Sequence, residues 1–162
     1  MLPEEGVNYI MNTKKITRIA VIAALYTAIT VLMAPFSYGM VQVRVSEALT
    51  ILPFLFPESV IGLFLGCLIS NIYGGLGLID IVFGSLATLI AAYLTSKMPR
   101  TYLAPLPPVL VNAVVVGFIL KYVLGAPLLI SMLYVGFGQL LACYGLGLPL
   151  LYLLRRYNFT KL

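Results

Sequence analysis

The sequence is poor in the side chains that most catalytic and metal sites need. It contains no histidine, two cysteines and five acidic residues among its 162 residues. Metal catalysis needs clustered histidine, cysteine or carboxylate ligands, and Ser-His or Cys-His chemistry needs a histidine base. Both cysteines, Cys67 and Cys143, fall within apolar stretches, where packing is a commoner role than a disulfide or a redox site. We therefore expect no enzyme activity, no bound metal and no cofactor.

Charged residues are also scarce, whereas apolar residues dominate. Charged residues make up 9% of the chain, hydrophobic residues 62%, and the mean hydropathy is +1.08, as in integral membrane proteins. The apolar runs are continuous rather than alternating, which predicts transmembrane helices and not a β-barrel. The net charge of +5 comes from basic residues scattered beside these runs, so the lipid bilayer is an expected partner and nucleic acid is not.

The chain is expected to form a single membrane domain over residues 1–162, with an N-terminal extension at residues 1–13. The expected helices cover approximately residues 16–34, 46–57, 59–73, 79–97, 106–123 and 127–154. The apolar region at 48–73 is long enough for one span or for two short ones, and the positive-inside rule favours two. Two spans place most basic residues on the side of the termini. These residues are Lys14, Lys15, Arg18, Lys97, Arg100, Arg155, Arg156 and Lys161. The sequence thus predicts an all-α bundle of six transmembrane helices with both termini cytoplasmic.

Two of the few charges, Arg44 and Glu47, stand at the start of a short apolar run within residues 41–57. As an α-helix, residues 48–56 would rise only about 14 Å, against a hydrocarbon core of about 30 Å. Pro53 interrupts this second helix further, so we expect it to be short and proline-broken. Such an element is tolerated at membrane depth where protein covers it or a wet cavity lies beside it. It either holds an ion pair between Arg44 and Glu47 or forms one wall of a binding site.

The residues just before this helix alternate between apolar and polar. Residues 41–46 have a period of two, which predicts an extended segment in a structured loop. Ser46 is placed to cap the helix, and Glu47 suits the positive end of the helix dipole. We expect the loop to cover a ligand and the short helix to form the wall beside it.

In this topology most of the rare polar side chains lie in the outer half of the bundle, and Asn112 and Gln139 lie deeper. Those in the outer half are Arg44, Glu47, Asn71, Tyr73, Asp80 and Lys121. The candidate substrate-binding residues are Arg44, Glu47, Asn71, Tyr73, Asp80, Asn112, Gln139 and Tyr134. Ionisable residues at membrane depth usually mark a pathway or a pocket. A carboxylate accepts paired hydrogen bonds from a guanine-like edge, and tyrosine faces, including that of Tyr38, stack on flat rings. The set predicts an outward-facing pocket for a small, flat, polar molecule.

Several of these residues also have a purely structural alternative. Asp80 either neutralises a ligand amine or caps a helix. Asn71 either contacts a ligand or satisfies backbone groups at the end of its helix. Asn112 and Gln139 are equally suited to hydrogen bonds between helices, and Lys121 is expected to extend its ammonium group to the membrane surface.

Small residues recur along the first expected span. Ala20, Ala24 and Ala28 are four residues apart and therefore form one flat face of a helix. Such a face lets another helix approach closely. It serves either packing within the bundle or docking of a separate membrane subunit.

Three stretches of the chain are distinctive, namely RVSEALTILPFLFPESVIGLFLGCLISN, GLIDIVFGSLATLIAAYLT and PPVLVNAVVVGFIL. In these stretches the chain resembles the QueT family of proposed queuosine-precursor transporters. The six predicted helices and the alanine stripe are similar to those of substrate-binding (S) components of energy-coupling factor (ECF) transporters. In that family the small-residue motif of helix 1 corresponds to Ala20, Ala24 and Ala28.

The resemblance implies a multi-pass protein of a prokaryotic cell membrane that binds a 7-deazaguanine, such as preQ1, preQ0 or queuine, from outside. It also implies a transmembrane coupling (T) protein and two ATPase subunits as partners. No Walker motif is present, so the chain itself is not expected to hydrolyse ATP. The alternatives are an S component for another vitamin or nucleobase, or a structural membrane protein.

Overall fold

The computed structural model describes residues 4–38 and 43–157, with side chains from residue 13 onward within those ranges. The described residues form helices and connections, and none of them lies in a strand. In chain order the elements are α1 (Glu4–Leu32), α2 (Ala34–Ser37), η1 (Val45–Phe54), α3 (Ser59–Gly74), η2 (Asp80–Gly84), α4 (Ser85–Ser96), η3 (Thr101–Leu103), α5 (Leu106–Leu124), α6 (Leu128–Leu140), η4 (Leu141–Gly147) and α7 (Leu148–Arg156). Here η1 and η3 are 3-10 helices, and η2 and η4 are π-helical segments.

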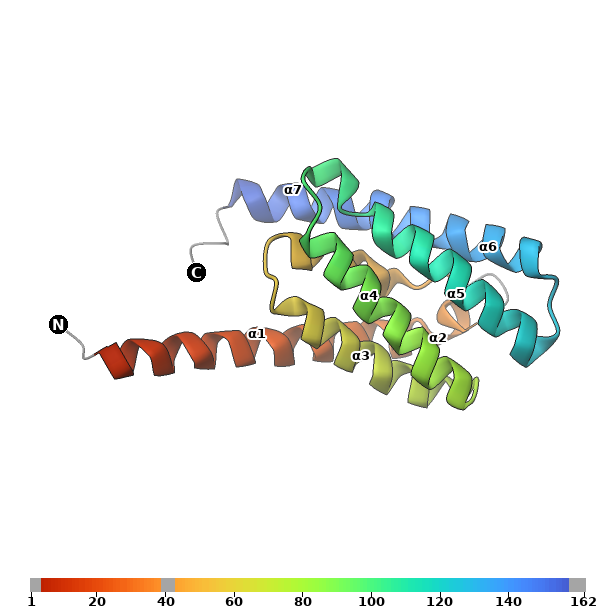
Figure 1. Cartoon of the computed structure of the whole chain (residues 1–162), viewed down its shortest axis with the longest axis horizontal. Coiled ribbons are helices and arrows are strands. Elements are labelled where there is room, and N and C mark those ends of the chain that lie inside the picture. The colour runs from red at the N-terminus through yellow and green to blue at the C-terminus, as the bar shows by residue number, and fades with distance from the viewer. Residues whose placement is uncertain (1–3, 39–42, 158–162) are drawn as a thin grey trace.

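The elements run back and forth along one long axis, and the start of α1 and the end of α7 both lie toward the left in Figure 1. Among the described residues, three stretches are long and apolar enough to cross a membrane, namely Thr13–Leu32, Thr101–Leu124 and Leu128–Arg156. The shorter apolar helices are Val45–Phe54, Ser59–Gly74 and Asp80–Ser96. The expected all-helical fold is therefore confirmed for the described residues, with three stretches able to span a membrane.

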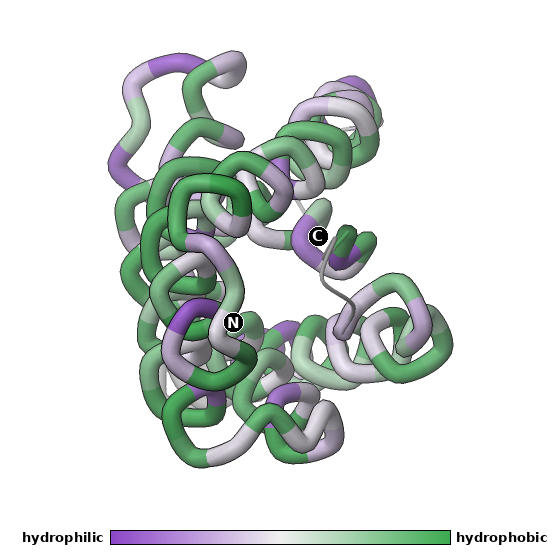
Figure 2. The backbone as a smooth tube through the Cα atoms, turned by 90° about the vertical axis from the view of Figure 1, so that its right-hand side faces the viewer, coloured by the Kyte–Doolittle hydropathy of each residue, from purple (hydrophilic) through white to green (hydrophobic). Residues whose placement is uncertain are grey.

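The outside of the bundle is apolar, as a lipid-facing surface requires. In Figure 2, which looks along the bundle, the hydrophobic colour predominates along the backbone on all sides. Large apolar side chains are exposed in different parts of the chain: Leu32 at the end of α1 is 80% exposed, Leu78 just before η2 is 77% exposed and Leu129 in α6 is 70% exposed. In water such exposure would mark an aggregation-prone surface, whereas in a bilayer it matches the solvent.

α1 packs tightly against α3 through two glycines. A Cβ atom on Gly62 would lie 2.7 Å from the carbonyl oxygen of Ile19, and one on Gly66 would lie 2.9 Å from that of Ala23. Real Cβ atoms do not approach backbone this closely, so only glycine permits the contact. The fully buried Tyr26 lies on this inner side of α1.

The alanine stripe lies on a different side of α1. Ala20, Ala24 and Ala28 are all exposed, and with neighbouring residues they line a shallow groove of about 510 Å³. Of the two alternatives for the stripe, packing within the bundle therefore does not occur in this structure. The glycines of α3 provide the close approach on the other face.

The helix boundaries differ from the expected ones at the N-terminus. α1 begins at Glu4 and ends at Leu32, so residues 4–13, expected as an extension, continue the first helix. A separate short helix, α2, follows it. The second expected helix is η1, and its ten residues extend about 20 Å at the 3-10 rise of about 2.0 Å per residue.

η1 is almost entirely buried, although it is too short for an ordinary span. It packs against α1, α4 and η4 and includes Pro53. Ser46 does not cap it, because no side-chain cap hydrogen bond forms and the Ser46 hydroxyl instead lies 2.7 Å from that of Thr30 in α1. The expected loop at 41–46 lies partly outside the described residues.

Candidate functional site

A cluster of polar side chains lies buried between η1, α3, η2, α5 and α6. Six of the eight expected substrate-binding residues belong to it and are at most 5% exposed. They are Arg44, Glu47, Asn71, Asp80, Asn112 and Gln139. We call this set the buried polar cluster.

Arg44 is held on the side of α3 and η2. Its Nη1 donates a hydrogen bond to Asn71 Oδ1 at 2.9 Å, and its Nε lies 3.4 Å from the carbonyl oxygen of Ser37. Its Nη2 is 3.8 Å from Asp80 Oδ2, an ion-pair distance that is too long for a hydrogen bond. The guanidinium also lies 5.5 Å from the centre of the Tyr38 ring, as in a cation–π contact.

The expected ion pair between Arg44 and Glu47 is not formed. Arg44 precedes η1 with an extended backbone, φ −83° and ψ 99°, so its side chain is not on the helical surface that an i, i+3 pair requires. Arg44 reaches Asp80 instead. Glu47, in the first turn of η1, has different partners.

Glu47 accepts hydrogen bonds from two neutral groups. The Tyr26 hydroxyl donates to Oε1 at 2.5 Å, and Asn112 Nδ2 donates to Oε2 at 3.1 Å. Cys143 lies beside the same residue, with Sγ 3.4 Å from the Glu47 carbonyl oxygen. Glu47 therefore links α1, η1 and α5 in the middle of the bundle.

Asn71 connects α3 to the start of the next helix. Its Nδ2 lies 3.2 Å from the carbonyl oxygen of Asp80 and 3.3 Å from Ser85 Oγ, while its Oδ1 accepts from Arg44. It does not serve the end of its own helix, which was the structural alternative. Its amide instead orients Arg44 and the backbone of η2.

Four side-chain atoms of the cluster are buried without a hydrogen-bond partner. They are Arg44 Nη2, both carboxylate oxygens of Asp80 and Asn112 Oδ1. The alternative that Asp80 caps a helix is wrong, because no side-chain cap hydrogen bond forms at η2 or α4. Buried polar groups are nearly always paired, so unpaired ones indicate a missing partner such as a ligand or water.

A small cavity of about 10 Å³ opens within the cluster, enough for about one water molecule. It is lined by Arg44, Glu47, Gly84, Thr88, Asn112, Val116, Val135 and Gln139. The lining combines charged, amide and hydroxyl groups with two valines. Such a mixture orients a polar ligand while its apolar part is covered.

Tyr73 and Tyr134 lie outside the cluster, contrary to expectation. Tyr73 is 63% exposed and Tyr134 is 47% exposed, although Tyr134 lines a separate cavity of about 20 Å³ near the α5–α6 turn. Asn71 faces inward, and two helical positions later Tyr73 points to the other side of α3. Tyr38 does approach the site: its hydroxyl donates to the Ser70 carbonyl oxygen at 2.6 Å, and burial raises the pKa of its phenol.

Sequence reasoning missed Tyr26, Gly84 and Thr88. Tyr26 carried one usable signal, because a tyrosine within an apolar helix needs a partner for its hydroxyl. Thr88 Oγ1 lies 3.2 Å from Cys67 Sγ, a contact with no sequence pattern.

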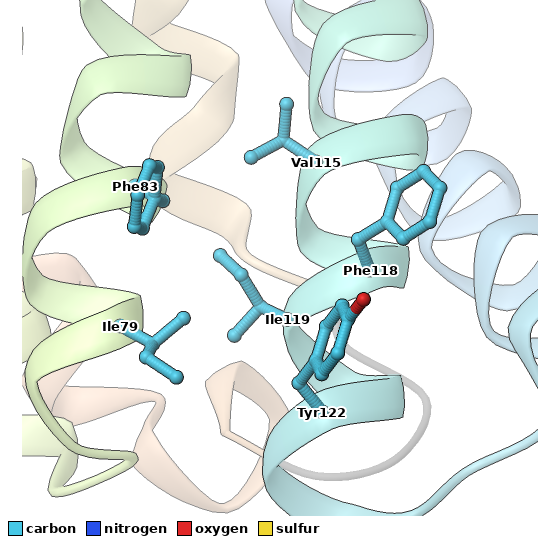
Figure 3. A pocket seen from close by; sticks show the side chains of 6 residues that line it. All are labelled: Ile79, Phe83, Val115, Phe118, Ile119 and Tyr122. Carbon is cyan, nitrogen blue, oxygen red and sulfur yellow. The ribbon is translucent and has the colours of Figure 1, made fainter.

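A much larger groove lies on the outside of the bundle between η2 and α5. It measures about 410 Å³, and Figure 3 shows its side chains. They are Ile79, Phe83, Val115, Phe118, Ile119 and Tyr122. Phe83 is 57% exposed and Tyr122 74%, so the groove faces the lipid. With almost no polar lining it offers nothing to orient a polar molecule, and the smaller polar cavity is the better site.

The described residues contain no group of three or more histidine, cysteine or carboxylate side chains that would hold a metal ion. Both cysteines are buried and free. The chemistry available in the cluster is hydrogen bonding and charge pairing.

Comparison with known proteins gives a family for most of the chain. A family model described as QueT transporter matches residues 16–156. A relative from Lactococcus lactis subsp. cremoris (strain MG1363), called queuosine precursor transporter QueT, is 38% identical over 81 residues. That alignment covers 49% of this chain and 47% of the relative, so the chain spans about half the length of the curated relative it matches. No solved structure matches.

Proposed function

Because this chain belongs to the QueT transporter family, we propose that it is the S component of an ECF-type importer that binds a queuosine precursor from outside. The ligand is a 7-deazaguanine such as preQ1, preQ0 or queuine. The observation that carries this proposal is the buried polar cluster with its four unpartnered atoms. Unpartnered polar atoms inside a membrane protein are energetically unfavourable, and they occur chiefly where they bind a ligand or an ion.

The cluster offers groups that suit a guanine-type edge. This edge presents an N–H and an amino group side by side together with a carbonyl oxygen, and carboxylates and amides pair with such groups. Glu47, Asn112 and Gln139 lie beside the cavity and supply these groups. A bicyclic base is far larger than about 10 Å³, so binding requires the helices around the cavity to separate.

The proposed topology has six membrane crossings and cytoplasmic termini. The N-terminal half of α1, the connection between α4 and α5, and the end of α7 lie at the left-hand end of the bundle in Figure 1. These segments carry most of the basic residues, which the positive-inside rule places in the cytoplasm. Asn71 and Asp80 flank the connection between α3 and η2 at the opposite end, so we place this part of the cluster in the outer half of a prokaryotic cell membrane.

The proposed partners are a transmembrane coupling protein and two ATPase subunits, with the lipid bilayer around them. The exposed stripe of Ala20, Ala24 and Ala28 gives the coupling protein a flat face for close helix packing. ATP hydrolysis resides in the partner subunits. This chain contributes ligand binding and docking, and no enzyme activity.

The proposal is tested by ligand-dependent stability of the purified protein in detergent. Titration with preQ1, preQ0 and queuine is expected to raise the melting temperature for at least one of them. At a free ligand concentration 100 times Kd, binding stabilises the native state by about 2.7 kcal/mol. Adenine, which presents a different edge, serves as the control and is expected to give no shift. The absence of a shift with every 7-deazaguanine would overturn the proposal.

A double variant separates transport from a purely structural role. Glu47→Gln with Asp80→Asn keeps the size of both side chains and removes both carboxylate charges from the cluster. We expect uptake of the precursor to be lost in cells that hold folded protein at the normal level. Unchanged uptake would favour a structural role for these carboxylates.

A further inference from the structure

The buried polar cluster has an uneven balance of charge. It contains two carboxylates, Glu47 and Asp80, and one guanidinium, that of Arg44, and these residues are 1%, 0% and 5% exposed. Three helices, α3, α4 and α5, pack against η2. Among the described residues of these helices the one charged side chain is Lys121, which is exposed. Two negative groups thus share one positive group.

The two carboxylates also differ in the hydrogen bonds that they accept. Glu47 accepts one hydrogen bond at each oxygen, from Tyr26 and Asn112. Asp80 accepts none, and the nearest cationic atom, Arg44 Nη2, is 3.8 Å away. Arg44 meanwhile uses Nη1 and Nε on Asn71 and Ser37. Asp80 is therefore the carboxylate that lacks a partner.

The unpartnered atoms define what a ligand must bring. Three of the four are acceptors, the two Asp80 oxygens and Asn112 Oδ1, and one is a donor, Arg44 Nη2. A ligand that satisfies them is rich in N–H donors and carries few acceptors. An anionic ligand does not fit, since it would add to an excess of negative charge and meet only one free donor.

We propose that Asp80 selects a cationic ligand: the site takes a 7-deazaguanine whose 7-substituent carries a protonated amine, in preference to one with a neutral substituent. This inference rests on the proposed function and narrows it. The ammonium group donates to the Asp80 oxygens and balances the second carboxylate. The planar base occupies the cavity beside Glu47 and Asn112.

Gly84 brings Asp80 within reach of that cavity. It lines the cavity and lies in the π-helical segment η2. A Cβ atom there would be 2.7 Å from Asp80 Oδ1 and 3.0 Å from Asn71 Nδ2. Asp80 is fully buried and does not itself line the cavity, but Gly84 places no side chain between the cavity and its carboxylate. π-helical segments often occur where a helix adjusts to a function.

The wild-type protein tests the proposal with three ligands that differ in one group. The aminomethyl compound is a cation at pH 7, whereas the hydroxymethyl and cyano compounds are neutral. We expect calorimetric titration to give a Kd for the aminomethyl compound that is about 10-fold to 100-fold lower than for either neutral one, as for a hydrogen bond to a charged group. Equal affinities would overturn this inference and leave the proposed function standing. Failure of all three compounds and of queuine to bind would overturn the proposed function as well.

Substitution of Asp80 tests whether its carboxylate causes the preference for the cationic ligand. Asp80→Asn is expected to weaken binding of the aminomethyl compound by about 10-fold or more, while binding of the hydroxymethyl compound changes by less than about 3-fold. Glu58→Gln is the matched control, because it removes the same charge from an ion pair with Arg18 outside the cluster. The control is expected to keep the wild-type ratio of affinities. A preference that persists in Asp80→Asn would overturn the role of Asp80.

Discussion

The buried polar cluster and the alanine stripe lie on two sides of α1 and differ in polarity and exposure. Tyr26 of α1 is fully buried and donates to Glu47, whereas Ala24, two positions earlier, is exposed. The cluster is polar, enclosed and incompletely paired. The stripe is apolar, flat and open. The difference indicates that ligand recognition and subunit docking are separated, with α1 in contact with both.

This separation predicts the largest loss of stability for the central cation of the cluster. Arg44→Met removes the partner of Asn71 and leaves Asp80 as an uncompensated buried charge. Breaking a buried ion pair from one side typically costs about 3–5 kcal/mol. We expect a corresponding loss of unfolding free energy and no detectable ligand binding, measured by thermal unfolding in detergent and by titration.

The matched control for this prediction is Arg100→Met. Arg100 is exposed and its side chain contacts Tyr102, so the substitution is expected to change the unfolding free energy by less than about 0.5 kcal/mol. If Arg44→Met were as stable as this control, the cluster would not hold the fold together.

An intermediate effect is expected where the two regions are joined. A Cβ atom on Gly66 would lie 2.9 Å from both the Ala23 carbonyl oxygen and Tyr26 Cβ. Gly66→Ala is therefore expected to push α1 away from α3 and to lower the unfolding free energy by about 1–3 kcal/mol, as overpacking does. Thermal unfolding measures the effect. Gly145→Ala is the control, because nothing lies within 4 Å of the added Cβ, and equal melting temperatures for the two variants would contradict the tight α1–α3 contact.

The sequence predicts the helices and most residues of the buried polar cluster, but it does not predict which of these residues form hydrogen bonds or ion pairs with one another. Continuous apolar runs locate the helices because a bilayer requires them, and rare charges such as Glu47 and Asp80 stand out against that background. The pairing depends on contacts far apart in the chain: Glu47 meets Asn112 across 65 positions. The i, i+3 spacing of Arg44 and Glu47 was misleading because the backbone at Arg44 is extended.

The tyrosines show a second limit of the sequence. Tyr26 and Tyr73 both lie in apolar helices, yet the first is buried and the second is 63% exposed. A tyrosine in a membrane helix is equally suited to a buried hydrogen bond and to the lipid–water interface. Only the packing of α1 against α3 and η1 distinguishes the two, and no local pattern encodes it.

The smallest effect on stability, together with a large effect on transport, is expected at the alanine stripe. Ala24→Phe adds a ring to an exposed position. We therefore expect the unfolding free energy and the free energy of ligand binding to remain within about 0.5 kcal/mol of the wild-type values. Uptake into cells should nevertheless be abolished, because the ring prevents another helix from approaching the flat face. Leu25→Phe is the control, since Leu25 is 48% exposed one position away and lies off the stripe. Normal uptake by Ala24→Phe, or equal losses in both variants, would show that docking does not use the stripe. Loss of uptake in Ala24→Phe alone, with ligand binding intact, would establish that the two sides of α1 serve separate steps.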